Sequence, residues 1–235
     1  MSATQTLDKL TVVVPVGPGD ALSARLCEQL AMLPTRAQVR VVRAEGDCEA
    51  TPAFANASEQ RAQWQSMQAP AGRATQQNAG ARGADGEWLW FLHADSVLAP
   101  ATLPALARFI ETKSDALGYF DLHFLDDGPA LMGLNACGAW LRSRWLGLPF
   151  GDQGLVLLRA AFEKLGGFDT ALSSGEDHDL VWRARRAGLP LRAIGAPIYT
   201  SARKYAEQGW WRTTAHHLTE TGRQARRFSR PQATR

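Results

Sequence analysis

The segment Leu10–Val16 constrains the fold more than any other part of this 235-residue chain. Its sequence, LTVVVPV, is a continuous apolar run rich in β-branched residues. Such a run predicts a strand buried on both faces, as in a parallel sheet that helices cover on each side. Glycine and proline at positions 17–19 end the strand, and a leucine-rich stretch with helical spacing follows as far as Pro34.

The next segments continue this alternation of strand and helix. They comprise a second strand, a helix-compatible stretch, an Ala/Gln-rich helix and a third strand: Val39–Val42, Thr51 to about Met67, Gly72–Ala84 and Glu87–Leu92. That order predicts an α/β fold with a mostly parallel central sheet and flanking crossover helices. Because ligands of such sheets bind beyond the carboxyl ends of the strands, we expect Glu45, Asp47 and Asp95 at that edge.

The second half of the chain predicts further elements of both kinds. Strand alternation covers Gly118–Leu125, and Leu131, Leu134, Leu141 and Trp145 form an apolar stripe with helical spacing. Later elements are a strand, two helices and two short strands: Leu155–Leu158, Ala160–Leu165, Ser173–Ala187, Leu189–Ile194 and Ile198–Thr200. With no internal repeat or low-complexity linker, we expect one domain over residues 10–205, between a tail at 1–9 and a basic segment at 206–235.

The formal net charge of +3 conceals two parts of opposite sign. Residues 201–235 hold eight basic and two acidic residues, a net charge of +6, so the remainder carries −3. This charge does not indicate a nucleic-acid-binding protein. In the basic segment Trp211, Ala215, Leu218 and Ala225 share a helical face flanked by arginines. Such a helix either packs on the domain or makes peripheral contact with an anionic membrane, where a lipid-linked acceptor would lie.

The cysteines and the hydropathy pattern indicate a compartment. Three cysteines without a CxxC pair do not form a disulfide framework, which favours a reducing environment. Neither a signal peptide nor an apolar run of about 20 residues is recognisable. We therefore expect a soluble, cytoplasmic protein, peripheral at the inner membrane face if the basic segment binds lipid.

Three groups of residues have the chemistry of a site. Asp95 follows a buried strand, where one acid plus substrate phosphates suffices for Mg²⁺ or Mn²⁺. Glu176 and Asp177 open a predicted helix and could supply a general base. Arg73 and Asn78 could recognise phosphate or nucleobase. The alternatives are a turn-capping aspartate, ordinary helix capping and a solvated helix face.

The motifs in their order resemble glycosyltransferase family 2. The order is GRATQQNAGARGADGEWLWFLHADS, GYFDLHF, LRSRWLGLPFGDQG, LGGFD, EDHDLVWRARRAG and TSARKY. The chain is most similar to the small bacterial subgroup described as transferase 2, radical-SAM/selenodomain-associated, over roughly residues 10–215. The resemblance implies a GT-A nucleotide-diphospho-sugar transferase sandwich, a nucleotide-sugar donor, a divalent cation (Mn²⁺ or Mg²⁺) and inversion at the anomeric carbon.

The resemblance also assigns roles to individual residues. Asp177 matches the catalytic base, with Glu176 beside it, and Asp95 matches the last acid of the DxD-type metal motif. His93 stands where the first acid of that motif usually stands. The loop Gly151-Asp152-Gln153 matches one that faces donor sugar and acceptor. We assign substrate binding to His93, to the three residues of this loop and to five further residues: Pro15, Val16, Glu45, Arg73 and Asn78.

This sequence departs from the family pattern at several places, including residues 17–20, where a NE-type pair is usual, and this keeps alternatives open. The motif at 93–95 has lost one acid, and Glu45 or Asp47 must replace the usual aspartate after the second strand. We expect a metal-assisted, non-processive inverting transfer of one sugar to an acceptor hydroxyl, since the QxxRW motif of polymer synthases is absent. A non-catalytic nucleotide-sugar binding module is the main alternative. A nucleotidyltransferase is weaker, because residues 17–20 contain no lysine to hold phosphate.

Overall fold

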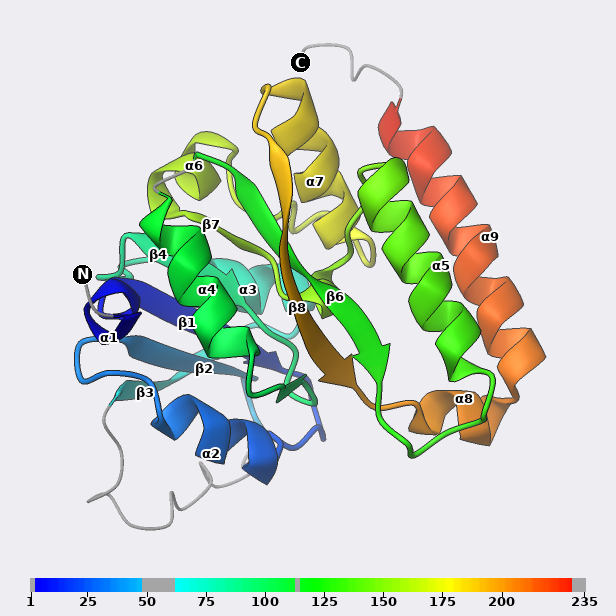
Figure 1. The fold of residues 1–235 in the computed structure, drawn as a ribbon, viewed down its shortest axis with the longest axis horizontal. Coiled ribbons are helices and arrows are strands. Elements are labelled where there is room, and N and C mark those ends of the chain that lie inside the picture. The colour runs from blue at the N-terminus through cyan, green and yellow to red at the C-terminus, as the bar shows by residue number, and fades with distance from the viewer. Residues whose placement is uncertain (1–2, 48–61, 113–114, 230–235) are drawn as a thin grey trace.

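The fold is a three-layer α/β sandwich, known here from a computed structural model that describes residues 3–47, 62–112 and 115–229 (Figure 1). In these residues, eight strands form one sheet in the order β3-β2-β1-β4-β7-β6-β8-β5. The strands are β1 Leu10–Val16, β2 Gln38–Ala44, β3 Gln63–Ala69, β4 Trp88–Phe91, β5 Val97–Leu98, β6 Leu117–Phe124, β7 Val156–Leu158 and β8 Leu191–Thr200.

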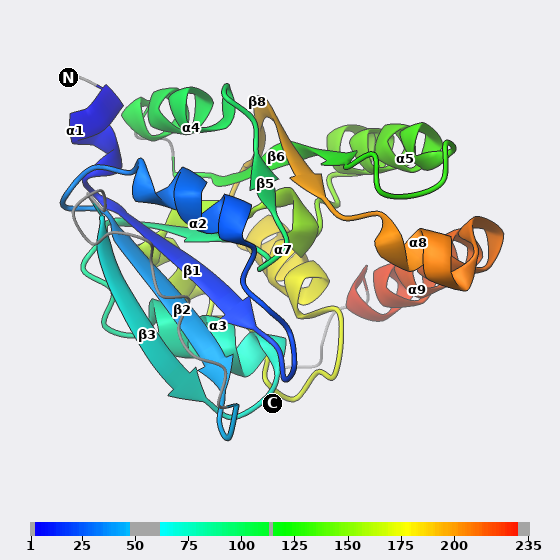
Figure 2. The ribbon, with the colours of Figure 1, turned by 90° about the horizontal axis from the view of Figure 1, so that it is seen from below.

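Helices cover both faces of the sheet, with α2 and α4 on one side and α3 and α7 on the other (Figure 2). The helices are α1 Ala3–Leu7, α2 Ala24–Ala31, α3 Arg73–Ala81, α4 Thr102–Glu111, α5 Met132–Trp145, α6 Arg159–Lys164, α7 Glu176–Arg186, α8 Arg203–Gln208 and α9 Trp210–Ser229, with the short 3₁₀ turn η1 Gly151–Gln153. None of the described helices is long and apolar enough to cross a membrane.

The sheet has a parallel part and a mixed part. Strands β3, β2, β1 and β4 run parallel to their neighbours, whereas β7 is antiparallel to both β4 and β6. Strand β8 pairs parallel with β6 and antiparallel with β5. The expected sheet with flanking helices is therefore confirmed, and the carboxyl ends of β1, β2 and β4 meet at one edge.

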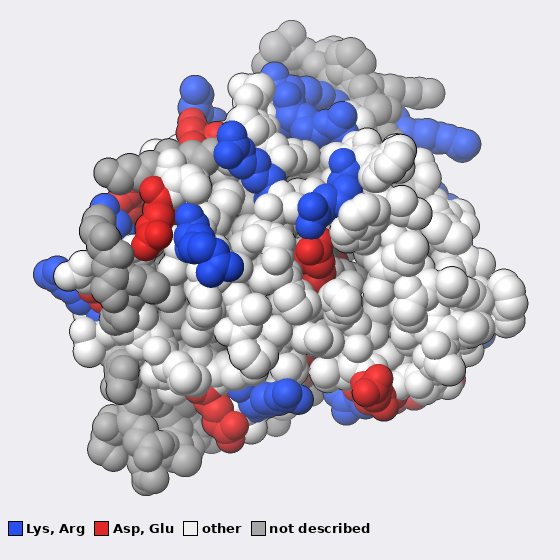
Figure 3. Space-filling view, in the orientation of Figure 1, with Lys and Arg blue, Asp and Glu red and all other residues white. Residues whose placement is uncertain are grey.

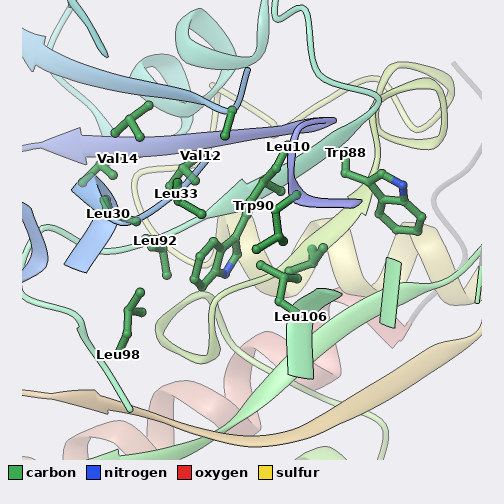
Figure 4. Close-up of a cluster of buried hydrophobic side chains, with 14 of the residues drawn as sticks. Leu10, Val12, Val14, Leu30, Leu33, Trp88, Trp90, Leu92, Leu98 and Leu106 are labelled. Atoms are coloured by element: carbon green, nitrogen blue, oxygen red, sulfur yellow. The ribbon is translucent and has the colours of Figure 1, made fainter. Parts of the chain in front are cut away.

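Strand β1 is buried along its whole length, as its apolar sequence predicts. Val12 and Val14 pack with α2 and α4 on one face, next to Trp90 and Leu106 (Figure 4). Val13, on the opposite face, belongs to the cluster beneath α3 and α7. Successive side chains of a strand point to opposite faces, so an uninterrupted apolar run serves both layers.

Strand β3 corrects the helix expected from Thr51 to about Met67. Residues 48–61 lie outside the described part, but Gln63–Ala69 pairs with β2 along its length. Trp64 packs against one core cluster and Met67 against the other, which is the two-sided alternation of a strand. The polar residues between them are tolerated because β3 is an edge strand with exposed positions.

Helix α5 forms where it was expected, but its apolar stripe is not in the core. The helix packs on β6 through Met132, Ala139 and Ser143, and the Tyr119 hydroxyl donates to the Ser143 carbonyl at 3.1 Å. The stripe side chains are exposed by 43% to 78%: Leu131, Leu134, Leu141 and Trp145. At the other end of the chain, residues 3–7 of the expected tail form α1, where Thr6 donates to Glu111 of α4.

Candidate active site

Three segments that are distant in sequence meet beyond the end of β4. They are the turn after β4 with His93 and Asp95, the turn η1, and the first turn of α7. The Gly151 amide donates to Asp177 Oδ2 at 2.6 Å. A Cβ placed on Gly151 would lie 3.3 Å from His93 Nε2 and 3.1 Å from Asp177 Oδ2. Even a methyl group at residue 151 would therefore push the imidazole or the carboxylate by a few tenths of an ångström.

Asp177 is held in its ionised form. Its second oxygen, Oδ1, accepts the His178 amide at 2.9 Å. Burial raises the pKa of Asp177, but attraction to His178, the Gly151 N–H and Arg73 together bring it below its ordinary value. Burial lowers the pKa of His178 itself to about 4, so His178 carries no charge at neutral pH. The contributions that still lower the pKa of Asp177 at that pH come from the backbone donors and Arg73. The result is a fixed carboxylate that can accept a proton.

Glu176 is buried next to Asp177 and pairs with Arg73, Oε1 to Nη1 at 3.5 Å. Burial and the Asp177 charge raise the pKa of Glu176. Arg73 opens α3, and its side chain is 53% exposed. Both residues line a cavity of about 310 Å³ between residues 71–75 and residues 170–173. A guanidinium there is placed to receive an anionic ligand.

Among these buried acids, Asp152 has a strongly raised pKa. Burial raises its pKa to about 6, and repulsion by Asp177 adds to this against attraction by Arg142. Its Oδ1 is buried without a hydrogen-bond partner. Asp152 therefore has a free acceptor close to Asp177, which suits contact with a hydroxyl-bearing ligand.

The loop that contains Asp152 is fixed by Arg142, which the sequence did not reveal as a site residue. The Arg142 guanidinium carbon lies 3.1 Å from the centre of the Phe150 ring, and His178 lies 3.6 Å from that ring on centroids. Arg142 also donates to the Gln153 amide oxygen at 3.2 Å. No local pattern marks Arg142, since it is one of several arginines near the end of α5. The structure makes it the support of the loop.

His93 and Asp95 are the residues placed to hold a divalent cation. His93 Nε2 is buried and has no hydrogen-bond partner. Burial and Arg73 lower its pKa to about 4, so the imidazole is neutral and can act as a ligand. Asp95 accepts the Thr200 hydroxyl at 3.1 Å through one oxygen, Oδ2. Among the described residues no group of three His, Cys, Asp or Glu side chains could hold a metal. This pair fits only a cation that takes its other ligands from phosphate and water.

Several predicted residues have other environments. Pro15 and Val16 are buried at the end of β1, where Val16 accepts the Gln76 amide at 2.6 Å. Glu45 is exposed directly after the end of β2. Gln153 and Asn78 use their amides inside the protein, Gln153 towards Phe120, Phe150 and Arg142, and Asn78 towards both backbone groups of Phe168.

Nearly half of the chain matches a known protein family. Residues 53–163 match the family model described as Glycosyl transferase family 2. This part of the chain is similar to glycosyltransferase family 2. The match spans slightly less than half of the chain and includes α3, β4 and the turn with His93 and Asp95. No curated protein matches the chain.

Solved structures share the fold of this chain, the GT-A fold. TarS residues 1–349 from S. aureus are 18% identical, with a TM-score of 0.60 over 82% of this chain and 60% of that one. The same protein in complex with UDP-GlcNAc gives 0.57, covering 82% and 58%. The mannosyltransferase PcManGT from Pyrobaculum calidifontis, in complex with GDP-Man and Mn²⁺, is 19% identical with 0.57, covering 80% and 56%. The chain spans about three fifths of these proteins.

Proposed function

We propose that this chain is a non-processive, inverting glycosyltransferase that moves one sugar from a nucleotide-diphosphate sugar to an acceptor hydroxyl. The observation that carries the proposal is the Asp177 carboxylate, fixed by the Gly151 amide beside Arg73 and its cavity. The match to glycosyltransferase family 2 supports the proposal. Solved neighbours with UDP, UDP-GlcNAc or GDP-Man support the donor class.

In the proposed reaction, Asp177 removes the proton of the acceptor hydroxyl as the oxygen attacks the anomeric carbon. The new C–O bond forms on the face opposite the nucleotide diphosphate, whose bond to the same carbon breaks with its electron pair. The configuration therefore inverts, and the proton remains on Asp177 until solvent takes it. General-base assistance of this kind contributes about 10²–10⁴ in rate.

Arg73 and Asp152 serve binding in this proposal. Arg73 reaches the cavity that it shares with Glu176 and offers its charge to the diphosphate. Asp152 has a free carboxylate oxygen near Asp177 and accepts a hydroxyl of the donor sugar or the acceptor. Phe150, between Arg142 and His178, keeps this loop in place while both substrates bind.

A divalent cation fits the proposal through His93 and Asp95. When bound, a cation supplies Lewis-acid stabilisation of the departing diphosphate. Mg²⁺ is the harder of the two cations and takes oxygen ligands, whereas Mn²⁺ accepts an imidazole nitrogen more readily than Mg²⁺ does, so this pair favours Mn²⁺. The Mn²⁺-containing mannosyltransferase is in keeping with that preference.

The second candidate is a non-catalytic nucleotide-sugar binding module. One observation favours it: the position of the first acid of the DxD-type motif holds His93, so one carboxylate of the motif is missing. This candidate keeps the cavity at Arg73 and the donor class but gives no turnover. The binding module and the transferase therefore differ in one measurable property, the turnover of the donor.

A donor screen separates the two candidates. UDP- and GDP-sugars are titrated calorimetrically, and release of nucleotide diphosphate is followed in Mn²⁺ and in Mg²⁺. Binding with donor hydrolysis or transfer supports the transferase. Binding without release from any donor, under both cations and with acceptor mixtures, supports the binding module. Absence of binding contradicts both candidates.

The finer features of the proposal concern acceptor and origin. The motif order supports the bacterial subgroup described as transferase 2, radical-SAM/selenodomain-associated, and with it a cytoplasmic enzyme. The acceptor is a hydroxyl compound, and a lipid-linked one would suit the basic segment after residue 205. Mass spectrometry of products made from cell extracts and a labelled donor tests this acceptor class.

A further inference from the structure

Exposed large hydrophobic side chains are concentrated on one side of the molecule. Nine such side chains occur in the described residues, and Met32, directly after α2, is the only one outside α5, its two flanking residues and α9. The other eight are Leu131, Leu134, Trp140, Leu141, Trp145, Leu146, Trp211 and Leu218. A soluble domain rarely exposes apolar residues together unless they contact something.

Helix α5 contributes the larger share of this surface. Leu134, Leu141 and Trp145 are 63%, 46% and 78% exposed and follow the helical repeat along one stripe. The stripe points away from Met132 and Ala139, which contact the sheet side. Every residue of α5 is described, and Arg144 is its only charged residue at an exposed position.

Helix α9 continues the same surface. Asn135 of α5 accepts the Trp210 indole N–H at 2.8 Å and donates to Thr214 at 3.1 Å, so the two helices lie side by side. Trp211 and Leu218, 78% and 69% exposed, are turned from the Asn135 contact toward solvent. By helical geometry, the stripes of both helices lie on the side facing away from β6 and α7. Figure 3 shows a broad uncharged surface over α5 and α9.

The charges beside this surface are basic. Among its described side chains, helix α9 has three exposed arginines beside its apolar stripe: Arg212, Arg223 and Arg226. Figure 3 shows further basic side chains along the upper edge, where α7 and α9 end. A second copy of the chain on this surface would bring the basic residues of both copies into one contact, because a two-fold contact uses the same patch twice. An anionic lipid surface complements both the apolar stripe and the arginines.

We propose that the outer surface of α5 and α9 docks the protein on an anionic lipid bilayer. Leu134, Leu141, Trp145 and Trp211 enter the interfacial region, and the arginines of α9 contact the headgroups. Tryptophan is favoured at this depth because its ring is apolar and its N–H is polar. The sequence suggested membrane contact through the basic segment alone, and this proposal adds α5 to the contact surface. It does not depend on the transfer reaction.

The test is co-sedimentation of the full chain with vesicles of phosphatidylcholine alone or mixed equally with phosphatidylglycerol. We expect binding to the anionic vesicles, weakened by added salt. The double substitution Leu141→Gln and Trp145→Gln reduces partitioning roughly tenfold, since it removes two interfacial side chains. Arg226→Ser reduces it about fivefold. Met32→Gln, at the exposed residue directly after α2, leaves partitioning unchanged.

Further readouts decide between lipid and other partners. Brominated phosphatidylglycerol quenches tryptophan fluorescence of the native chain and quenches the Trp145→Phe variant less. Circular dichroism confirms that each variant is folded. Equal binding of the α5 double variant and the native chain overturns the proposal, as does absence of binding to anionic vesicles. A concentration-dependent dimer by light scattering, lost in the same double variant, assigns the surface to self-association and also overturns it.

Discussion

The Gly151 amide nitrogen lies 2.6 Å from Asp177 Oδ2 and joins the turn before β7 to the first turn of α7. Asp177 thereby has a defined position relative to His93 on one side and Asp152 on the other. Neither the turn nor the helix would fix the carboxylate alone. The position of the proposed base therefore depends on the contact between the turn and the helix. The residues around Asp177 give four predictions.

Replacing Asp177 by Asn should remove transfer and leave donor binding intact. The amide is nearly isosteric but cannot take the acceptor proton, so we expect kcat to fall by about 10²–10⁴. The measurement is single-turnover transfer with calorimetric titration of the donor. Glu176→Gln is the matched control, and it should alter donor affinity through Arg73 more than it alters kcat. Unchanged turnover of the Asn variant would contradict the assignment.

Replacing Gly151 by Ala should slow catalysis with little loss of stability. The new methyl would meet Asp177 Oδ2 at 3.1 Å and His93 Nε2 at 3.3 Å, which displaces both groups. A small misplacement of a reacting group costs about 10–100-fold in rate. Gly133→Ala in α5, where nothing lies within 4 Å of the new methyl, is the control and should retain full activity. Equal activity of the two variants would show that the close packing is unimportant.

Replacing Arg142 by Lys should loosen the loop around Asp152 although the charge is kept. Lysine cannot cover the Phe150 ring and also reach the Gln153 amide and the Leu148 carbonyl. We expect about 1–3 kcal/mol less stability and at least tenfold lower kcat/KM. Thermal unfolding and initial rates measure both effects. Arg144→Lys, where the native residue pairs with Asp121 at the surface, should change neither by a comparable amount.

Asp152 should reduce stability at neutral pH. Burial raises its pKa to about 6 from 3.8, so between these values the folded chain binds more protons than the unfolded chain. The free energy of unfolding therefore falls as pH rises through this window. Asp152→Asn should be more stable than the native chain at pH 7, by on the order of 1–2 kcal/mol, because the side chain is partly accessible to water.

That stability difference should disappear below about pH 4, where Asp152 is protonated in both states. Chemical unfolding at the two pH values measures it. Asp126→Asn, at an exposed loop position, is the control for the loss of one carboxylate. A native chain as stable as the Asp152→Asn variant at pH 7 would rule out the raised pKa.

The sequence predicts three strands of the parallel half of the sheet well, β1, β2 and β4, because they are apolar runs or end at polar turns. Strand β1 and the helix at 73–81 appear where the patterns place them. Strand β3 could not be predicted from local composition, since its polar residues are tolerated by an edge position that only the sheet order reveals. The stripe on α5 has the spacing of a core helix, and only the tertiary structure shows it exposed.

For the site, motif order brought together Asp177, Glu176, Asp152 and Asp95. Arg142 and Thr200 were missed as site residues because each acts through a contact with a residue more than ten positions away. Asn78 illustrates the opposite case. Its amide has the chemistry for ligand recognition but is occupied by the Phe168 backbone, which no pattern within α3 discloses.

The pairing of β5 with β8 sets the order in which the site can form during synthesis. Asp95 precedes β5, and its partner Thr200 ends β8, more than a hundred residues later. A nascent chain that has exposed its parallel strands to solvent still lacks this hydroxyl and the α7 carboxylates. The Gly151–Asp177 contact can therefore form once residue 177 has emerged, whereas Asp95 gains its Thr200 partner only after the ribosome has delivered residue 200.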